Sequence, residues 1–381
     1  MGKRGNGEGS IYPKRNKDGK TVGYRGSYWV YTADGPKRRY ISGKRREDVR
    51  DKLAKALSDR AGGFVFDAGA MTVGEYLKRW LGDVKDTVRD STWQRYEYAI
   101  RPHIEPALGK VKLKDLTPAQ LRWFYRDRLD SGLAPASVHK LHVVMHKALK
   151  AAVEDGLIPR NVATGLKLPK ITRKEINPLT KDEARLLLDT SKASGDRLEA
   201  LYVLALSTGM RQGELLALKW DDLDFERGIL RVRRTLTKVG KSFTTGEPKT
   251  KKSRRVIRLT TGATDALRRH LTAQLAEIER MGSLYQPGGF VFASTTGSIL
   301  DPSHLRSRSL KPLLKAAKLR PVRFHDLRHT CATLLLSQNI NPKIVSEMLG
   351  HASVAITLDI YSHIMPDMQE KAVEALEKML T

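Results

Sequence analysis

The chain has 381 residues, which is more than one ordinary hydrophobic core organises, so two or three domains of ~100 to 200 residues are expected. Its 69 Lys and Arg residues against 42 Asp and Glu residues give a formal charge of +27, which indicates a polyanionic partner, most commonly nucleic acid. No run approaches the ~18 apolar residues of a membrane span, and the basic start lacks the apolar segment of a signal peptide, so a cytoplasmic, nucleoid-associated protein is expected. The single cysteine, Cys331, excludes an internal disulfide and a cysteine metal cage.

The first sixty residues are the most basic part of the chain, with 17 basic and 7 acidic residues. Short runs of β character separated by turn signals predict strands at 9–15, 22–32 and 37–42, followed by a polar helix at 44–58. Aromatic and basic residues are interleaved on these strands, as in a sheet that lays one face in a DNA groove. The candidate DNA contacts are Arg25, Trp29, Lys37, Arg38 and Arg39. The competing interpretation is a solvated sheet whose aromatic residues only pack.

A Gly-rich linker at 61–70 precedes a helical segment. Apolar residues recur at helical spacing after Thr72, Ser91, Thr117 and Ala136, and the first of these starts shows a capping-box pattern. The spacing predicts a compact helical module of ~100 residues, whose aromatic residues we expect in its core.

A second linker, basic and bounded by prolines, covers 165–178. Helices at 181–193 and 196–207, strands at 229–235 and 254–259, and further helices from 261 to the end complete the chain. The predicted fold is therefore multidomain and mainly α with small β elements. Its expected domains are 1–62, a three-stranded sheet plus helix; 63–170, all helical; and 171–381, an α+β domain.

The last domain contains an ordered set of residues that suits attack on a DNA phosphodiester. Such a reaction needs a nucleophile, cations around the nonbridging oxygens, a base, and an acid for the leaving 5′-oxygen. The set that supplies them is Arg211, Lys249, His325, Arg328, His351 and Tyr361. A zinc site at His325 and His329 is a weaker interpretation, because no acidic base lies between them and no third ligand is evident.

The local contexts of these residues resemble the signature boxes of the tyrosine recombinases. The run STGMRQGELLALKW around Arg211 resembles the first box, and FHDLRHTCAT around Arg328 resembles the second. The runs Leu349-Gly350-His351 and Tyr361-Ser362-His363 complete the pattern. The resemblance is close over 171–381. It is weaker over 72–165, which is similar to the core-DNA-binding domain of these enzymes, and over 9–60, which is similar to the arm-DNA-binding domain of phage-type integrases.

The resemblance implies a role for each residue. Arg211 and Arg328 would clamp the scissile phosphate, and His351 would make a third contact. His325 would exchange the proton of the nucleophile Tyr361, and Glu214 would orient the site. Lys249 would protonate the leaving 5′-hydroxyl, although Lys251 and Lys252 compete for this role.

The implied reaction is cleavage and rejoining of DNA through a 3′-phosphotyrosine, with no cofactor and no metal, to integrate or excise a phage or mobile element. The implied partners are double-stranded attachment sites, a homotetramer on paired sites, and an excisionase or a host DNA-bending protein. The amphipathic tail after Pro366 would dock either on its own domain or on a neighbouring protomer.

Two alternatives of other kinds remain. A DNA-bending regulator would bind without cutting, and a dimer resolvase or relaxing topoisomerase would use the same chemistry for another purpose. The basic N-terminal module favours integration, by analogy of fold.

Overall fold

The structure is a computed structural model that describes residues 10–16, 18–32, 35–61, 71–172, 176–239, 242–247 and 254–361, with a few positions beyond them. The chain divides into two compact units, Met1–Thr172 and Arg173–Thr381. The Gly-rich linker after residue 61, Lys249 with its two neighbouring lysines, and most of the tail after Pro366 lie outside the described residues. Across the part that is described, every helix is too short or too polar to cross a membrane.

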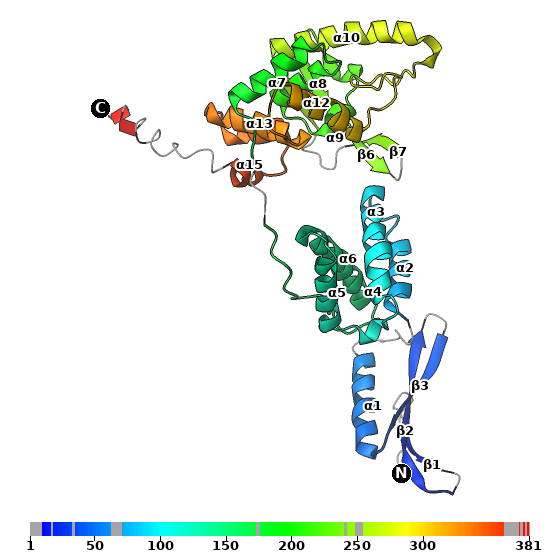
Figure 1. Ribbon diagram of the computed structural model, residues 1–381. Coiled ribbons are helices and arrows are strands. Elements are labelled where there is room, and N and C mark those ends of the chain that lie inside the picture. The colour runs from blue at the N-terminus through cyan, green and yellow to red at the C-terminus, as the bar shows by residue number, and fades with distance from the viewer. Residues whose placement is uncertain are drawn as a thin grey trace. The chain divides into compact units, whose positions relative to one another are not determined.

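The first unit begins with an antiparallel sheet covered by one helix. The strands β1 (Ser10–Arg15), β2 (Thr21–Thr32) and β3 (Gly35–Gly43) pair in chain order, and α1 (Arg46–Ala61) runs alongside them (Figure 1). Gly26 on β2 lets the helix approach, because a Cβ there would lie 3.1 Å from Cγ1 of Val49, a buried residue of α1. This arrangement confirms the predicted sheet and helix.

Side chains alternate between the two faces of this sheet. Gly26 pairs with Ile41 on the face that packs on α1. Arg25, Trp29 and Arg38 lie on the other face, and all three are exposed. Arg39 pairs with Tyr28 and therefore falls on the same side as Gly26, although it is also exposed.

The rest of the first unit is a helical module. Its helices are α2 (Val73–Asp83), α3 (Asp90–Ala99), α4 (Glu105–Leu108), α5 (Pro118–Asp130) and α6 (Pro135–Glu154), with a π-helical turn at Ile100–Ile104 between α3 and α4. Thr72 and Thr117 cap α2 and α5 through capping boxes, of which the one at Thr72 was predicted. Tyr76 and Phe124 are fully buried in its core, as expected, whereas Trp123 is 60% exposed.

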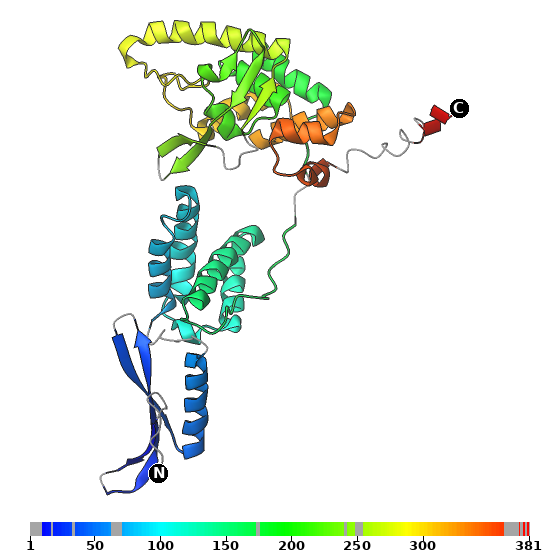
Figure 2. The same cartoon turned by 180° about the vertical axis from the view of Figure 1, so that it is seen from behind.

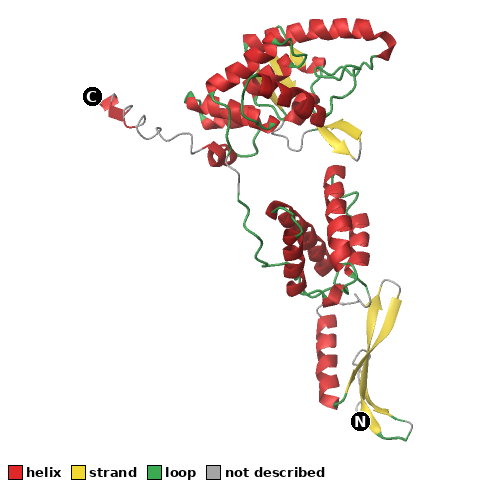
Figure 3. Cartoon of the chain, viewed as in Figure 1, coloured by secondary structure: helices red, strands yellow, loops and turns green. Residues whose placement is uncertain are grey.

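The second unit is built around α8 (Glu199–Thr208), which is buried along nearly its whole length. An almost entirely apolar helix is stable only when neighbours cover it on several sides. The neighbours that pack on it are α7 (Lys181–Ala193), α9 (Gln212–Leu216), α10 (Thr261–Met281) and α13 (Phe324–Ser337). The other α-helices among the described residues of this unit are α11 (Pro302–His304), α12 (Lys311–Ala316), α14 (Pro342–Leu349) and α15 (Val354–Tyr361). Figure 3 shows in red how far helices predominate.

The strands of this unit form a small sheet and a separate hairpin. The sheet pairs β4 (Leu223–Asp224), β5 (Ile229–Val232) and β8 (Arg255–Arg258), with Leu230, Val232 and Ile257 facing the core. The hairpin pairs β6 (Thr235–Val239) with β7 (Ser242–Gly246), and these two strands project from the helical body of the second unit in both views (Figures 1 and 2).

This hairpin was not predicted, and the predicted strand 229–235 joined β5 to the first residue of β6. The reason is that β7 is rich in Ser and Thr, and lacks the apolar alternation on which a strand prediction depends.

Candidate active site

Arg328 is held in the centre of the second unit by main-chain carbonyls. It lies on α13, whose first turn is capped by Asp326, which accepts hydrogen bonds from the backbone N and side chain of Arg323. Nη1 of Arg328 donates to the carbonyls of Gly209 and Leu349, each at 2.8 Å. The side chain is buried, so its charge lies in a region of low dielectric where interaction with an anion is strong.

Arg211 reaches the same place from a different element. It is the N-cap residue of α9, and its Nη2 donates to the carbonyl of Gly350 at 2.9 Å. About a third of its side chain, 37%, is exposed, so it remains accessible to a ligand. The two arginines thus bind the carbonyls of adjacent residues, 349 and 350, although they are far apart in sequence.

Two glycines make this convergence possible. Gly209 ends α8 and Gly350 ends α14, both with a left-handed backbone, at φ +61° and +70°. A Cβ on Gly209 would lie 2.3 Å from Leu349, and one on Gly350 would lie 3.0 Å from Nη1 of Arg255. A side chain at either position would therefore combine backbone strain with a clash.

Glu214 joins Arg211 to a second arginine, Arg255. Its carboxylate accepts hydrogen bonds from the backbone N and Nη1 of Arg211, and from Nη1 and Nη2 of Arg255. Burial alone would raise the pKa of Glu214, but the bonds and charge of Arg255, followed by those of Arg211, outweigh burial and lower it. Glu214 is therefore a carboxylate that holds two cations in place.

His351 follows Gly350 directly and is half-buried beside the arginines. Its Nδ1 lies 2.8 Å from Oγ1 of Thr357, a fully buried residue of α15. Burial, and then the charges of Arg328 and Arg211, lower the pKa of His351 to about 4. The imidazole is thus neutral near pH 7 while no anion is bound.

His325 and His329 lie one turn apart on α13, with ring centroids 4.8 Å apart. Burial is the main cause that lowers the pKa of both, that of His329 to about 4. Among the described residues, no cluster of three or more His, Cys, Asp or Glu side chains could hold a metal ion.

The structure describes the backbone of Tyr361, and Lys249 lies outside the described residues. Tyr361 is the last residue of α15, a helix that begins three residues after His351, but its side chain is outside what the structure describes. Lys249, Lys251 and Lys252 lie in the undescribed segment between β7 and β8. The structure therefore brings together Arg211, Glu214, Arg328 and His351, with His325 on the same helix as Arg328.

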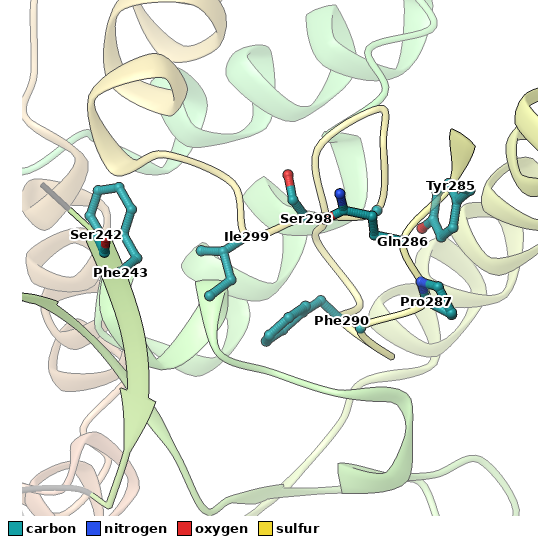
Figure 4. A pocket seen from close by; sticks show the side chains of 10 residues that line it. Ser242, Phe243, Tyr285, Gln286, Pro287, Phe290, Ser298 and Ile299 are labelled. Atoms are coloured by element: carbon teal, nitrogen blue, oxygen red, sulfur yellow. The ribbon is translucent and has the colours of Figure 1, made fainter. Parts of the chain in front are cut away.

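Of two hollows on this unit, the larger contains none of these residues and the smaller adjoins them. One of about 770 Å³ lies between Ser242 and Phe243 of β7 and the segment 285–299, which contributes Tyr285 and Phe290 (Figure 4). It contains none of the residues predicted for catalysis. A smaller one, of about 390 Å³, is lined by Arg255, Gly350 and His351 among others, and so adjoins them.

The sequence matches known proteins over nearly its whole length. Residues 177–368 match the phage integrase family, and residues 72–128 match the N-terminal SAM-like domain of phage integrases. A tyrosine recombinase XerC-like protein of Caldanaerobacter subterraneus is 31% identical over 90% of this chain and 92% of its own length. The chain belongs to the phage integrase family. It is accordingly a tyrosine-type site-specific DNA recombinase.

Other proteins similar to this chain are also named integrases. The ICEBs1 integrase of Bacillus subtilis is 28% identical over 79% of this chain and 81% of its own length. Among solved structures, the Tn1549 transposon integrase in complex with transposon right end DNA has a TM-score of 0.69 at 22% identity, covering 81% of this chain and all of the other. A lambda integrase dimer bound to a core site has a TM-score of 0.58 at 21% identity, covering 94% and 96% of the two chains. These structures show a common fold.

Two residues of the integrase site, Arg255 and Thr357, were not predicted from the sequence. Arg255 ends a basic run and was given no role from the sequence, yet it shares the inward face of β8 with Ile257. That alternation was the available signal. Thr357 is a polar residue within the mostly apolar helix α15, and no local pattern pairs it with His351.

Proposed function

We propose that Arg211, Arg328 and His351 bind the scissile phosphate of DNA and that Tyr361 attacks it. The observation that carries the proposal is the convergence of the two guanidinium groups on the carbonyls of residues 349 and 350, next to His351. Guanidinium groups match phosphate oxygens in geometry and charge, and they stabilise the additional negative charge of a pentacoordinate transition state. Their hydrogen bonds to carbonyls and to Glu214 hold them in place before the substrate arrives.

In the proposed reaction the phenol oxygen of Tyr361 forms a bond to phosphorus while the bond from phosphorus to the 5′-oxygen breaks. The phenol must lose a proton, which costs free energy at neutral pH because its unperturbed pKa is ~10. His325 accepts that proton, which suits a histidine whose lowered pKa keeps it neutral. Lys249, or one of its neighbours Lys251 and Lys252, gives a proton to the 5′-oxygen as it leaves.

The product is a 3′-phosphotyrosine, which conserves the energy of the broken phosphodiester. A 5′-hydroxyl of a partner duplex then attacks phosphorus and gives its proton to the deprotonated lysine, while Tyr361 leaves and recovers its proton from His325, and the strand is rejoined. The number of phosphodiester bonds is unchanged, so the reaction needs no nucleotide cofactor. Its purpose is integration or excision of a phage or another mobile element.

We assign three modules to this function. Residues 1–62 bind arm-type DNA sites, 63–170 bind the core site, and 171–381 catalyse strand exchange. Arg25, Trp29 and Arg38 support the first assignment, because they share the face of the sheet that faces away from α1. The guanidinium carbon of Arg25 lies 4.2 Å from the ring centre of Tyr40, and that of Arg38 lies 5.9 Å from that of Trp29. Lys37 and Arg39 remain predicted contacts.

The reaction also defines the partners. The substrate is double-stranded DNA carrying attachment sites, and the enzyme works in the bacterial cytoplasm at the nucleoid. Two duplexes with two cleaved strands each require four copies of Tyr361, so we propose a homotetramer on paired sites. An excisionase or a host DNA-bending protein would set the direction of recombination.

A suicide substrate tests the proposed nucleophile. A nick close to the cleavage site lets the short 5′-hydroxyl fragment diffuse away, which traps the covalent complex. Wild-type protein should give a protease-sensitive adduct, whereas Tyr361→Phe should bind the same DNA with equal affinity and give none. Tyr98→Phe is the matched control, because Tyr98 is a strongly exposed tyrosine of the helical module. An undiminished adduct with Tyr361→Phe would refute the assignment, and a wild-type protein that binds without any adduct would support a DNA-bending regulator.

A further inference from the structure

We propose that Arg255 is a positioning residue for cleavage, which acts by keeping Arg211 available to the scissile phosphate. The inference rests on the proposed role of Arg211. Arg255 itself does not bind the phosphate, because its hydrogen-bond donors are directed at protein groups.

Arg255 is built into the unit as a core residue. It is the first residue of β8, pairs with Val232 of β5, and faces inward like Ile257 two positions later. Its side chain is only 7% exposed. Burying a guanidinium is costly unless several hydrogen bonds compensate, so its partners matter.

Those partners lie on two sides of the site. On one side, Nη1 and Nη2 of Arg255 donate to the two oxygens of Glu214, at 3.3 and 2.9 Å. The same oxygens accept from Arg211, one from Nη1 at 2.8 Å and the other from its backbone N at 3.0 Å. Each carboxylate oxygen of Glu214 is therefore shared between the two arginines.

On the other side, Nε of Arg255 donates to the carbonyl of Met348 at 2.6 Å. Its guanidinium lies against Gly350, where a Cβ would come within 3.0 Å of Nη1. The carbonyl of Gly350 is the acceptor of Arg211 Nη2, and the next residue is His351. One side chain thus supports both Arg211 and the turn that carries His351.

Charge sharing explains why this support affects the reaction. With Arg255 present, Glu214 divides its negative charge between two cations. Without it, the whole charge of a buried carboxylate would act on Arg211 and compete with the phosphate for its donors. The expected defect is therefore slow cleavage at nearly normal DNA affinity, since most affinity comes from contacts along the DNA backbone.

Single-turnover cleavage of the full-length integrase tests this inference. Arg255→Met keeps the length of the side chain but removes its charge, and Arg255→Lys keeps the charge but not the paired donors. Arg258→Met is the matched control, because Arg258 lies on the same strand but is exposed on the opposite face. DNA affinity and the thermal midpoint are measured for each variant, so that misfolding is recognised.

A misplacement of ~1 Å at a reacting group costs ~10²-fold in rate, so we expect Arg255→Met to cleave ~10- to 100-fold more slowly and Arg255→Lys to lie between it and the wild type. Arg258→Met should cleave at the wild-type rate. If Arg255→Met fails to fold, Arg255→Lys is judged by the same criteria.

A double-mutant cycle separates positioning from mere structural support. If Arg255 acts through Arg211, then Arg255→Met should add at most about a 2-fold loss to Arg211→Lys. Equal losses in both backgrounds, or wild-type cleavage by Arg255→Met, would overturn the inference. Wild-type cleavage by Arg211→Lys would instead refute the proposed phosphate site, so the two failures are distinguishable.

Discussion

Oγ1 of Thr357 lies 2.8 Å from Nδ1 of His351, and this hydrogen bond joins the turn after α14 to the helix that ends at Tyr361. Thr357 is fully buried, so the bond is shielded from water. A hydrogen bond at Nδ1 orients the ring and leaves Nε2 as the atom that can face a phosphate.

We therefore expect Thr357→Val to cleave suicide DNA more slowly by ~2- to 10-fold, the equivalent of one net hydrogen bond. Thr357→Ser keeps the hydroxyl and should cleave at nearly the wild-type rate. Thr357→Val keeps the shape of the side chain but lacks the hydroxyl. Neither variant should change the dissociation constant for DNA. A defect in Thr357→Ser together with wild-type cleavage by Thr357→Val would show that packing of the methyl group, rather than the hydrogen bond, is required.

The buried histidines predict how stability depends on pH. Folding lowers the pKa of His329 and His351 to about 4, so the unfolded chain binds protons that the folded chain does not. Their contribution to stability is complete above the ordinary histidine pKa of ~6.5 and is lost as pH falls toward 4. The thermal midpoint of the second unit should therefore decrease as the pH is lowered from 7 to 5. His329→Gln should make that decrease smaller. A variant with an unchanged slope would show that His329 is not neutral in the folded protein.

The N-terminal sheet predicts a separable DNA-binding activity. Deletion of residues 1–62 should abolish protection of distal arm sequences in a footprint while core-site binding and cleavage persist. In the full chain, Arg25→Ala and Arg38→Ala should weaken arm binding, and each lost phosphate contact should reduce the salt slope by ~0.9. Lys52→Ala is the control, because Lys52 is exposed on α1. A truncated enzyme that keeps both footprints would assign the sheet another role.

Lys249 is predicted to be the general acid. Replacing the leaving 5′-oxygen by sulfur tests this role. Loss of the proton donor should slow cleavage by ~10²- to 10⁴-fold, because an alkoxide leaves poorly at neutral pH. A 5′-phosphorothiolate leaves as a thiolate and needs no proton. Lys249→Ala should therefore be slow on ordinary DNA and fast on the sulfur substrate, whereas Lys251→Ala and Lys252→Ala should not show this rescue. If Lys249→Ala is slow on both, the lysine binds phosphate and the acid is another residue.

The sequence determined those features that depend on neighbouring residues. Helical spacing located α2 and α5, with a capping-box pattern at the start of α2, and β character with turn signals located the N-terminal sheet. The signature boxes around Arg211 and Arg328 also lie on short continuous segments, so the residues proposed for catalysis could be named before their arrangement was known.

Only the tertiary structure decided which of these residues meet. Arg211 and Gly350 are 139 positions apart, and no periodicity encodes a contact over that distance. Arg255 shows the limit most clearly, since one arginine in a basic run does not reveal whether its charge faces water or a buried carboxylate. Local spacing reports which side of a strand or helix is buried, whereas the partner on that side depends on how distant segments pack.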